Sequence, residues 1–204
     1  MDWISARWFR NCNLTARCWR SWPRAHEVYC DEQEALGWKW GEKKNEETKE
    51  NPSLVEWEKL PEEEKEQNRG QARDIPAKLA FAGCYMVPAA DGEPPFEFPP
   101  ALLEELASRE HTRWMRQKAR DGWRYGEPRD GAKRLHPCML PWTKGELAAY
   151  ADFADRLEDK ELSEEEKDKD RIAVREIPTI LKVAGYTVVE ASSEAGRARA
   201  AAQK

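Results

Sequence analysis

The sequence contains an internal repeat, which constrains the fold more than any other feature because the two copies must fold alike. The first block, HEVYCDEQEALGWKWGEKKNEETKENPSLVEW, covers residues 26–57, and the second, HTRWMRQKARDGWRYGEPRDGAKRLHPCMLPW, covers residues 111–142. They align without a gap at an offset of 85 residues, from His26 to His111. Each block holds a histidine, a G-W-x-[WY]-G motif, a proline and a final tryptophan in the same order. We therefore expect two copies of one structural unit.

The repeat continues beyond these blocks at a larger offset. LPEEEKEQNR (60–69) matches LSEEEKDKDR (162–171), and LAFAGCYMV (79–87) matches LKVAGYTVV (181–189), both at an offset of 102 residues. The increase from 85 to 102 indicates a 17-residue insertion in the second copy, within residues 143–161. Because this stretch is rich in alanine, leucine and acidic residues, we predict that the insertion forms an exposed helix.

Both copies predict the same order of elements. A helix carries the histidine and ends near Gly37 or Gly122, and the alternating aromatic residues of G-W-x-[WY]-G then favour a short extended segment. After a polar loop, the EEEK sequence begins a second helix, since acidic residues are stabilised in the first turn. The proline of an I-P dipeptide should kink or interrupt this helix. Gly83 or Gly185 should end it before a final short strand.

Composition sets the boundaries around the repeats. We predict a Trp- and Arg-rich N-terminal arm over residues 1–23, repeats over 24–90 and 103–191, a stiff proline-rich linker over 91–102, and a flexible tail over 192–204. The arm holds four of the ten tryptophans. It is a candidate for docking onto the rest of the protein or onto a protein partner, because Trp and Arg are typical interface anchors.

Charge, hydropathy and cysteine content exclude several classes of protein. The 34 basic and 39 acidic residues give a net charge of −5, which argues against a nucleic-acid partner. No run approaches the roughly 18 apolar residues of a membrane-spanning helix, so no membrane partner is expected. The five cysteines show no C-x-x-C spacing and therefore no zinc or redox motif. With no secretory signal, we expect reduced thiols and a cytoplasmic location.

The ordered motifs resemble a known family. H-x-x-[WY], G-W-x-[WY]-G, [NH]-P and L-x-E-E-E-K occur in both copies and resemble the ryanodine receptor repeat, or RyR domain, as a tandem pair of microbial or phage type. The resemblance implies an α+β fold in which the helices of each repeat pack on a small antiparallel sheet, and pseudo-two-fold symmetry relates the repeats. It also implies a nucleotide-binding module with an adenine-type base between the repeats. Such a module would act as a sensor or sponge in bacteria–phage conflict, in the cytoplasm of a bacterial or phage-infected cell.

The aromatic residues of the two G-W-x-[WY]-G motifs are the candidate base-binding residues. They are Trp38, Trp40, Trp123 and Tyr125. Two tryptophans on opposite sides of a cleft would sandwich a base, and stacking contributes about 1–3 kcal/mol per base. The alternative is that the four rings fill the cores of the repeats, and both interpretations stay open.

Polar candidates for the rest of the ligand come from the second helix and the segment before it. Arg69 and Arg171 occupy equivalent positions, with Asn68 beside the first, and the planar fork of arginine suits phosphate. A surface ion pair with the neighbouring acids is the more common role for a single arginine. Asn51 and His136 are equivalent residues that each precede a proline. They are candidates for hydrogen bonds to a ligand or to a loop carbonyl.

No pattern of catalytic or metal-binding residues is present. The sequence contains no P-loop, G-x-S-x-G or H-E-x-x-H motif, and its three histidines lack the spacing of a metal site. We therefore predict a non-enzymatic protein without a metal or cofactor. The alternative function is a protein–protein interaction or structural module without a small-molecule ligand. A homo-oligomer is among the oligomeric states left open.

Overall fold

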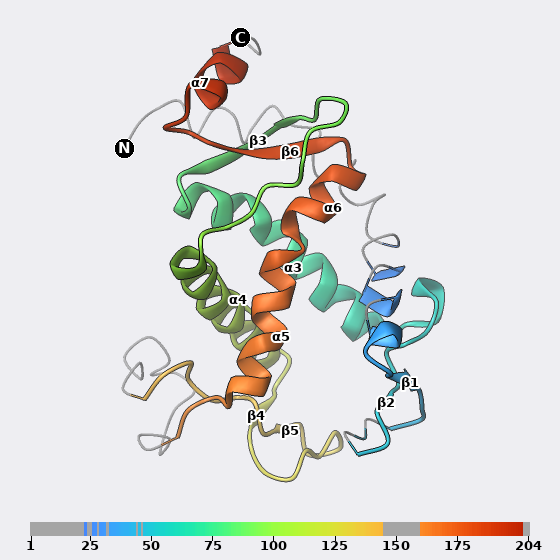
Figure 1. Ribbon diagram of the computed structural model, residues 1–204. Helices are drawn as coiled ribbons and strands as arrows, with labels where there is room; N and C mark the ends of the chain where they lie inside the picture. The colour runs from blue at the N-terminus through green and yellow to red at the C-terminus, as the bar shows by residue number, and fades with distance from the viewer. Residues whose placement is uncertain are drawn as a thin grey trace. The chain divides into compact units, whose positions relative to one another are not determined.

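The computed structural model describes residues 23, 26–27, 29–31, 33–43, 45, 47–144 and 160–201 (Figure 1). The predicted N-terminal arm before residue 23 and most of the predicted helical insertion lie outside the described residues. The chain divides into two compact units, of which one comprises the residues up to Pro95 together with those from Thr179 onward, and the other comprises residues 96–178. The end of the second repeat therefore belongs to the same unit as the first repeat.

The first repeat begins with a helix to which the described residues between 23 and 35 belong. It continues with β1 (Lys39–Trp40), β2 (Glu50–Asn51), the 3-10 helix η1 (Trp57–Lys59), α3 (Glu62–Phe81) and β3 (Cys84–Pro88). Three glutamates occupy the first turn of α3, where the helix dipole stabilises negative charge. Gly83 follows the helix with a φ of 65°, which confirms the predicted glycine stop.

The second repeat has the same kinds of element in the same order. It consists of α4 (Pro100–Arg120), β4 (Arg124–Tyr125), β5 (Leu135–His136), α5 (Glu164–Arg175), α6 (Ile177–Val183) and β6 (Tyr186–Glu190), and α7 (Glu194–Ala201) follows. Helix α4 starts inside the predicted linker, because a proline at the first helical position needs no N–H partner. Both repeats confirm a mixed α+β fold.

The proline of the I-P dipeptide affects the two repeats differently. Helix α3 continues through Pro76. In the second repeat the helix is interrupted at Glu176, so that Pro178 lies in the first turn of α6, where a missing N–H costs nothing. The predicted interruption is therefore present in the second repeat.

The prediction of a small antiparallel sheet within each repeat is wrong. Strand β1 pairs with β2 in parallel, and β4 pairs with β5 in parallel. The reason lies in the intervening loop, where an antiparallel bridge joins Asn45 to Glu50 in the first repeat and Asp130 to Leu135 in the second. Each loop thus reverses the chain direction twice, so the second strand runs parallel to the first.

A basic side chain ties each of these loops to the helix before it. Lys49 Nζ donates a hydrogen bond of 2.8 Å to the carbonyl of Leu36, and Arg134 donates to the carbonyl of Asp121. Lys49 and Arg134 both have positive φ, 51° and 53°. Because the last carbonyls of a helix lack intrahelical partners, these bonds stabilise the helix end as well as the loop.

Glycine is required where the two parallel strands approach each other. A Cβ atom on Gly126 would lie 2.9 Å from Leu135 Cδ2 and 3.0 Å from Leu135 Cβ. A Cβ atom on Gly41, the equivalent residue, would lie 2.6 Å from Glu50 Cβ. The two glycines of the motif therefore set how closely the strands pair.

Gly126→Ala is expected to lower the free energy of unfolding by about 1–3 kcal/mol, because the added methyl group must push β5 away from β4. Urea denaturation of the full chain measures the loss. Gly131→Ala is the matched control in the same loop, since a Cβ atom at Gly131 meets nothing within 4 Å. An equal loss in both variants would contradict this role of Gly126.

An antiparallel strand pair joins the ends of the two repeats. Strands β3 and β6 lie side by side, with Met86 opposite Val188 and Val87 opposite Thr187 (Figure 1). Met86 and Val188 are also equivalent in the repeat, because they are separated by the offset of 102 residues. The last strands of the two repeats thus form a two-stranded sheet of their own, separate from the β1–β2 and β4–β5 pairs. The predicted pseudo-two-fold symmetry of the whole repeats stays a prediction.

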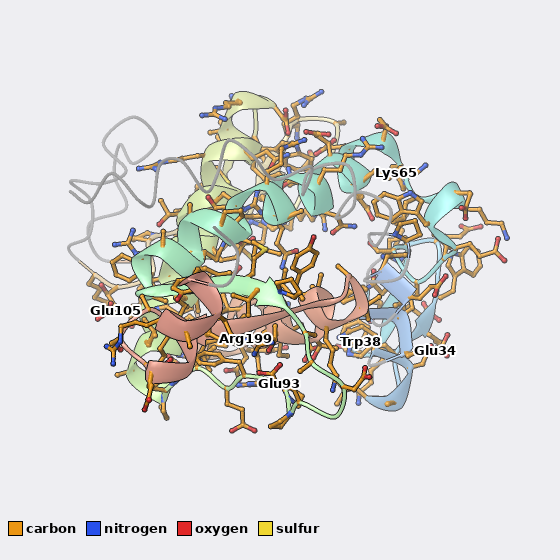
Figure 2. All side chains as sticks on the ribbon, turned by 90° about the horizontal axis from the view of Figure 1, so that it is seen from above. Glu34, Trp38, Lys65, Glu93, Glu105 and Arg199 are labelled. Carbon is orange, nitrogen blue, oxygen red and sulfur yellow. The ribbon has the colours of Figure 1, made fainter. Side chains whose placement is uncertain are left out.

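Helix α7 forms where the sequence predicts a flexible tail. The hydroxyl of Tyr85 donates to the carbonyl of Gly196, and Arg199 forms an ion pair of 2.6 Å with Glu93, which Figure 2 shows close together. The hydrogen bond from Arg199 holds the pKa of the Glu93 carboxyl below its ordinary value. These partners lie far from α7 in the sequence, so the local composition of the tail does not reveal them.

Equivalent apolar residues form the buried interior of both repeats. The pairs are Leu60 and Leu162, Ile75 and Ile177, Leu79 and Leu181, and Val87 and Val189. Each of these side chains is at most 8% exposed. The burial of both members of each pair agrees with the alignment of the repeats at the larger offset.

Candidate functional site

Each G-W-x-[WY]-G motif begins where a helix ends on glycine. Gly37 and Gly122 both have a φ of 84°, a left-handed conformation that favours glycine. The backbone N–H groups of Trp38 and Trp123 bond back into the preceding helix, at 2.9 and 3.0 Å. The two tryptophans therefore enter their strands with the same local geometry.

The aromatic residues of the two motifs differ in exposure. Trp40 is 56% exposed, whereas Trp123 is only 9% exposed. Trp38 and Tyr125 are half-buried. The ring of Trp123 lies edge-on to that of His136, with 5.9 Å between the centroids. The same motif thus holds an open indole in the first repeat and a covered one in the second.

Cationic side chains lie over the aromatic rings of the second repeat. Lys118 Nζ is 4.9 Å and Arg129 Cζ is 5.8 Å from the ring centroid of Trp123. Lys160 Nζ is 4.6 Å from the centroid of Tyr125 and donates a hydrogen bond to its hydroxyl. Lys118 is itself buried, at 7% exposure. Because ammonium and guanidinium groups are attracted to aromatic faces, these contacts hold positive charge against the motif.

Asn51 and His136 each accept a hydrogen bond from the turn that follows them. The N–H of Ser53 donates to Asn51 Oδ1 at 3.0 Å, and the N–H of Cys138 donates to His136 Nδ1 at 3.1 Å. Asn51 Nδ2 also donates to the Tyr29 hydroxyl at 3.1 Å. The two residues therefore each contact an N–H group of their own loop. Their contact with a ligand stays a prediction.

Equivalent histidines fasten the first helix of each repeat to the segment before the final tryptophan. His26 Nε2 lies 2.8 Å from the carbonyl oxygen of Val55, and His111 Nε2 lies 2.9 Å from that of Leu140. Both histidines are buried, at 5% and 2% exposure. This geometry agrees with the structural role that their equivalence in the repeat predicts.

The second of these histidines has an additional acidic partner. His111 Nδ1 lies 3.0 Å from Asp170 Oδ2. Burial raises the pKa of Asp170 above its ordinary value, although the hydrogen bond from His111 opposes this shift. Asn68 occupies the equivalent position in the first repeat, on α3, where it is half-buried. Asn68, a candidate for phosphate binding, thus corresponds to a largely buried carboxyl group in the second repeat, that of Asp170.

Arg171 is surrounded by carboxylates of its own unit. It contacts both oxygens of Glu104, at 2.7 and 2.9 Å, together with Asp168 at 2.7 Å and Glu164 at 2.9 Å. The hydrogen bond from Arg171 lowers the pKa of Glu104 below its ordinary value. The guanidinium also lies 5.6 Å from the ring centroid of Trp142. These contacts fix α5 against α4.

Arg69 makes the corresponding contacts within the first repeat. It pairs with Glu62 and, at 3.3 Å, with Glu66, both on its own helix α3. The alternative role predicted for these arginines was an ion pair with the acidic residues at the start of the helix. Such ion pairs are present for both Arg69 and Arg171. Phosphate binding by either arginine stays a prediction.

Comparison with known protein families identifies the repeated unit. A family model described as the RyR domain matches residues 23–88 and 99–190, which together form most of the chain. The chain belongs to the RyR domain family. The two matched segments are consistent with a tandem pair, and their limits agree with the repeats predicted from the sequence to within a few residues. The resemblance inferred from the motifs is thereby confirmed.

The two compact units divide the candidate residues between them. The first unit holds Trp38, Trp40, Asn51, Asn68 and Arg69, and the second holds Trp123, Tyr125, His136 and Arg171. Within the second unit, the structure brings Trp123 and His136 into contact. A base held between the two RyR domains stays a prediction.

Sequence reasoning missed the three cations beside the aromatic motif of the second RyR domain, Lys118, Arg129 and Lys160. The signal that could have found two of them is an excess of basic residues around this motif, because residues 109–134 contain nine basic and four acidic residues.

Among the described residues, no group of three or more His, Cys, Asp or Glu side chains is placed to hold a metal ion. In the same part of the chain, no helix is long and apolar enough to cross a bilayer.

Proposed function

We propose that this RyR protein is a non-enzymatic binding protein for a nucleotide or nucleotide-derived signal, which it recognises through the aromatic residues of its G-W-x-[WY]-G motifs. The observation that carries the proposal is Trp40, whose indole is 56% exposed on a strand paired with β2. The close approach at Gly41 and the bond from Lys49 to the helix end fix the backbone around it. An aromatic ring held in the open on a fixed backbone is suited to binding a flat ligand.

Stacking supplies enough free energy for this recognition. A base stacked on an aromatic side chain gains about 1–3 kcal/mol, largely independent of base identity. We also propose that a pseudo-two-fold axis relates the two RyR domains. This is supported by the register of β3 with β6, which sets Met86 opposite Val188, its equivalent in the repeat.

In this role the chain takes up its ligand without converting it, as a sensor or a sponge in bacteria–phage conflict. The support for this biological setting is the resemblance of the second copy, with its HPCMLPW sequence, to RyR domains of microbial type.

A protein–protein interaction module is the second candidate function. Large apolar side chains are exposed in the first unit, namely Tyr29 at 37%, Leu36 at 56%, Trp40 at 56% and Phe81 at 42%. Trp and Tyr are frequent anchors of protein interfaces. The two functions therefore compete for the same residue, Trp40, and a test with small molecules separates them.

Adenine nucleotides and cyclic nucleotides are expected to raise the melting temperature of the full chain. A ligand at one hundred times its Kd stabilises the folded state by about 2.7 kcal/mol. Trp40→Ala should remove the shift with little effect on the melting temperature of the free protein, because the indole is largely exposed. Phe81→Ala, also at an exposed aromatic residue, is the matched control and should keep the shift. If no nucleotide changes the melting temperature or the tryptophan fluorescence, the interaction module becomes the better account.

A further inference from the structure

The segment that contains the insertion of the second RyR domain supplies a cation to the aromatic motif of that domain. It comprises residues 143–161, whereas only residues 58–59 occupy the corresponding place in the first copy. Near the end of the longer segment, Lys160 places its Nζ atom 4.6 Å from the ring centroid of Tyr125. The motif of the second RyR domain is therefore covered by a lysine that a separate stretch of chain brings to it.

A carboxylate lies beside this lysine and ring. Lys160 donates a hydrogen bond to the Tyr125 hydroxyl, which itself donates one of 2.7 Å to Glu127. The hydrogen bond to Tyr125 and the nearby charge of Glu127 raise the pKa of Lys160 above its ordinary value. Aromatic faces and carboxylates both attract cations, so this part of the motif is suited to an ammonium group.

The first RyR domain has the ring and the carboxylate but not the lysine. Trp40 is equivalent to Tyr125 and is 56% exposed, and an indole attracts cations more strongly than a phenol ring. Glu42, which is equivalent to Glu127, is exposed and forms no ion pair with the residues that the structure describes. In that part of the chain, no cation lies over Trp40. The place that Lys160 fills in the second RyR domain is therefore open in the first.

The surface beside Trp40 is suited to the aliphatic stem of a lysine. Trp40 pairs in register with Asn51, whose Nδ2 donates a hydrogen bond of 3.1 Å to the Tyr29 hydroxyl. Trp40 and Tyr29, which is 37% exposed, therefore both adjoin Asn51 and form one partly exposed aromatic surface. Lysine packs its stem on such surfaces while its ammonium group stays in water.

The charge of the first RyR domain also favours a cationic partner. Residues 24–49 contain five basic and seven acidic residues, whereas the equivalent residues 109–134 contain nine basic and four acidic residues. Burial raises the pKa of the Cys30 thiol, and three acidic residues of the same helix raise it further, namely Glu34, Asp31 and Glu27. Cys30 follows Tyr29 in the sequence, so the negative field lies close to the aromatic surface and attracts cations to it.

We propose that Trp40 and Glu42 bind a lysine side chain of a protein partner, as Tyr125 and Glu127 hold Lys160 in the second RyR domain. The partner presents this lysine on an exposed segment of chain, because the occupant of the equivalent place is a side chain rather than a free cation. The inference goes beyond nucleotide binding and does not depend on it. A base and a lysine use the same face of the indole, so nucleotide binding releases the partner.

The probe for the lysine site is the tripeptide Ala-Lys-Ala with blocked ends, added to the full chain labelled with nitrogen-15 at its tryptophan indoles. The NMR signal of Trp40 is expected to shift as the peptide binds. That of Trp123 should stay unchanged, because Lys118 and Arg129 already lie over its ring. Acetylation of the peptide lysine removes its charge and should weaken binding about two- to fivefold, the effect of a cation on an exposed ring.

Variants of the chain test the two protein groups. Trp40→Phe removes the Trp40 signal and so identifies it. Glu42→Gln should weaken binding of the peptide about two- to fivefold, because an exposed charge pair is lost. Glu47→Gln is the matched control, since Glu47 is an exposed acid of the same loop, but the equivalent residue of the second RyR domain is Ala132.

Three results would overturn the lysine site: an unchanged Trp40 signal, equal binding of the acetylated peptide, or an equal weakening by both glutamate variants. Adenosine tests the proposed function separately, and it should shift the Trp40 signal by itself and displace the peptide. If adenosine shifts no tryptophan signal while the peptide still does, the nucleotide proposal fails and the lysine site stands. Adenosine that shifts the Trp40 signal without displacing the peptide would contradict their competition for the ring.

Discussion

Replacing His111 with alanine is expected to lower the free energy of unfolding by about 3–5 kcal/mol, because the change breaks a buried pair and leaves both partners without their hydrogen bond. His111 Nε2 faces the carbonyl oxygen of Leu140 at 2.9 Å, and Nδ1 faces Asp170 at 3.0 Å. A carbonyl oxygen only accepts, so Nε2 must carry a hydrogen. The proton between Nδ1 and Asp170 then makes the pair either imidazolium with carboxylate or imidazole with carboxylic acid.

The equivalent histidine of the first RyR domain provides the control. His26 bonds to the Val55 carbonyl at 2.8 Å, and the residue of the first RyR domain that is equivalent to Asp170 is Asn68, which is uncharged. His26→Ala should therefore cost less, about 1–3 kcal/mol for one unsatisfied buried acceptor. Urea denaturation of both variants in the full chain measures the difference. Equal losses would show that Asp170 adds nothing to the second RyR domain.

Several parts of this structure could be predicted because local rules determine them. The glycines at positions 37, 83, 122 and 185 all have positive φ and end helices, as the position of each glycine after a helical segment indicated. The equivalence of His26 and His111 indicated a role in the fold, and both histidines are buried. A residue that recurs at one offset in both copies occupies the same place in the fold of each, which is why the repeat was informative about the core.

The direction of the short strands could not be predicted in this way. A strand of two residues shows no periodicity, so G-W-x-[WY]-G indicates an extended segment but not its partner. The parallel pairing results from the tight turns at Asn45 and Asp130, whose side chains accept N–H groups of their own loops. Contacts between residues that are distant in the sequence, such as that of His111 with Asp170, could not be predicted from local patterns either.

The candidate site was predictable as a set of aromatic positions but not in its asymmetry. Alignment of the two copies treats Trp40 and Tyr125 as equivalent, whereas the structure exposes the first and places Lys160 over the second. The surroundings of each ring come from residues outside the motif, and these differ between the copies in charge. Equivalence in a repeat therefore indicates shared backbone geometry more securely than shared ligand chemistry.

Val188→Asp is expected to lower the free energy of unfolding by about 4 kcal/mol or more, because it buries an unpaired carboxylate where an apolar side chain packs. Val188 is 3% exposed and lies opposite Met86 in the β3–β6 pair. Val183→Asp is the matched control, since Val183 on α6 is 50% exposed and the same substitution there should change stability by no more than about 0.5 kcal/mol.

Hydrogen exchange shows where the loss of stability is felt. Val188 belongs to the second RyR domain by sequence, but its strand β6 pairs with β3 of the first RyR domain. On β3, Val87 follows the residue opposite Val188 and is 0% exposed. A strand that loses its partner leaves a row of unpaired N–H groups, so the amides of β3 should exchange faster together with those of β6. Exchange that rises in β6 alone would mean that β3 is held by α3 without its partner strand. Faster exchange in both strands would mean that the first RyR domain depends on the end of the second, so the tandem pair folds as one cooperative structure through this sheet.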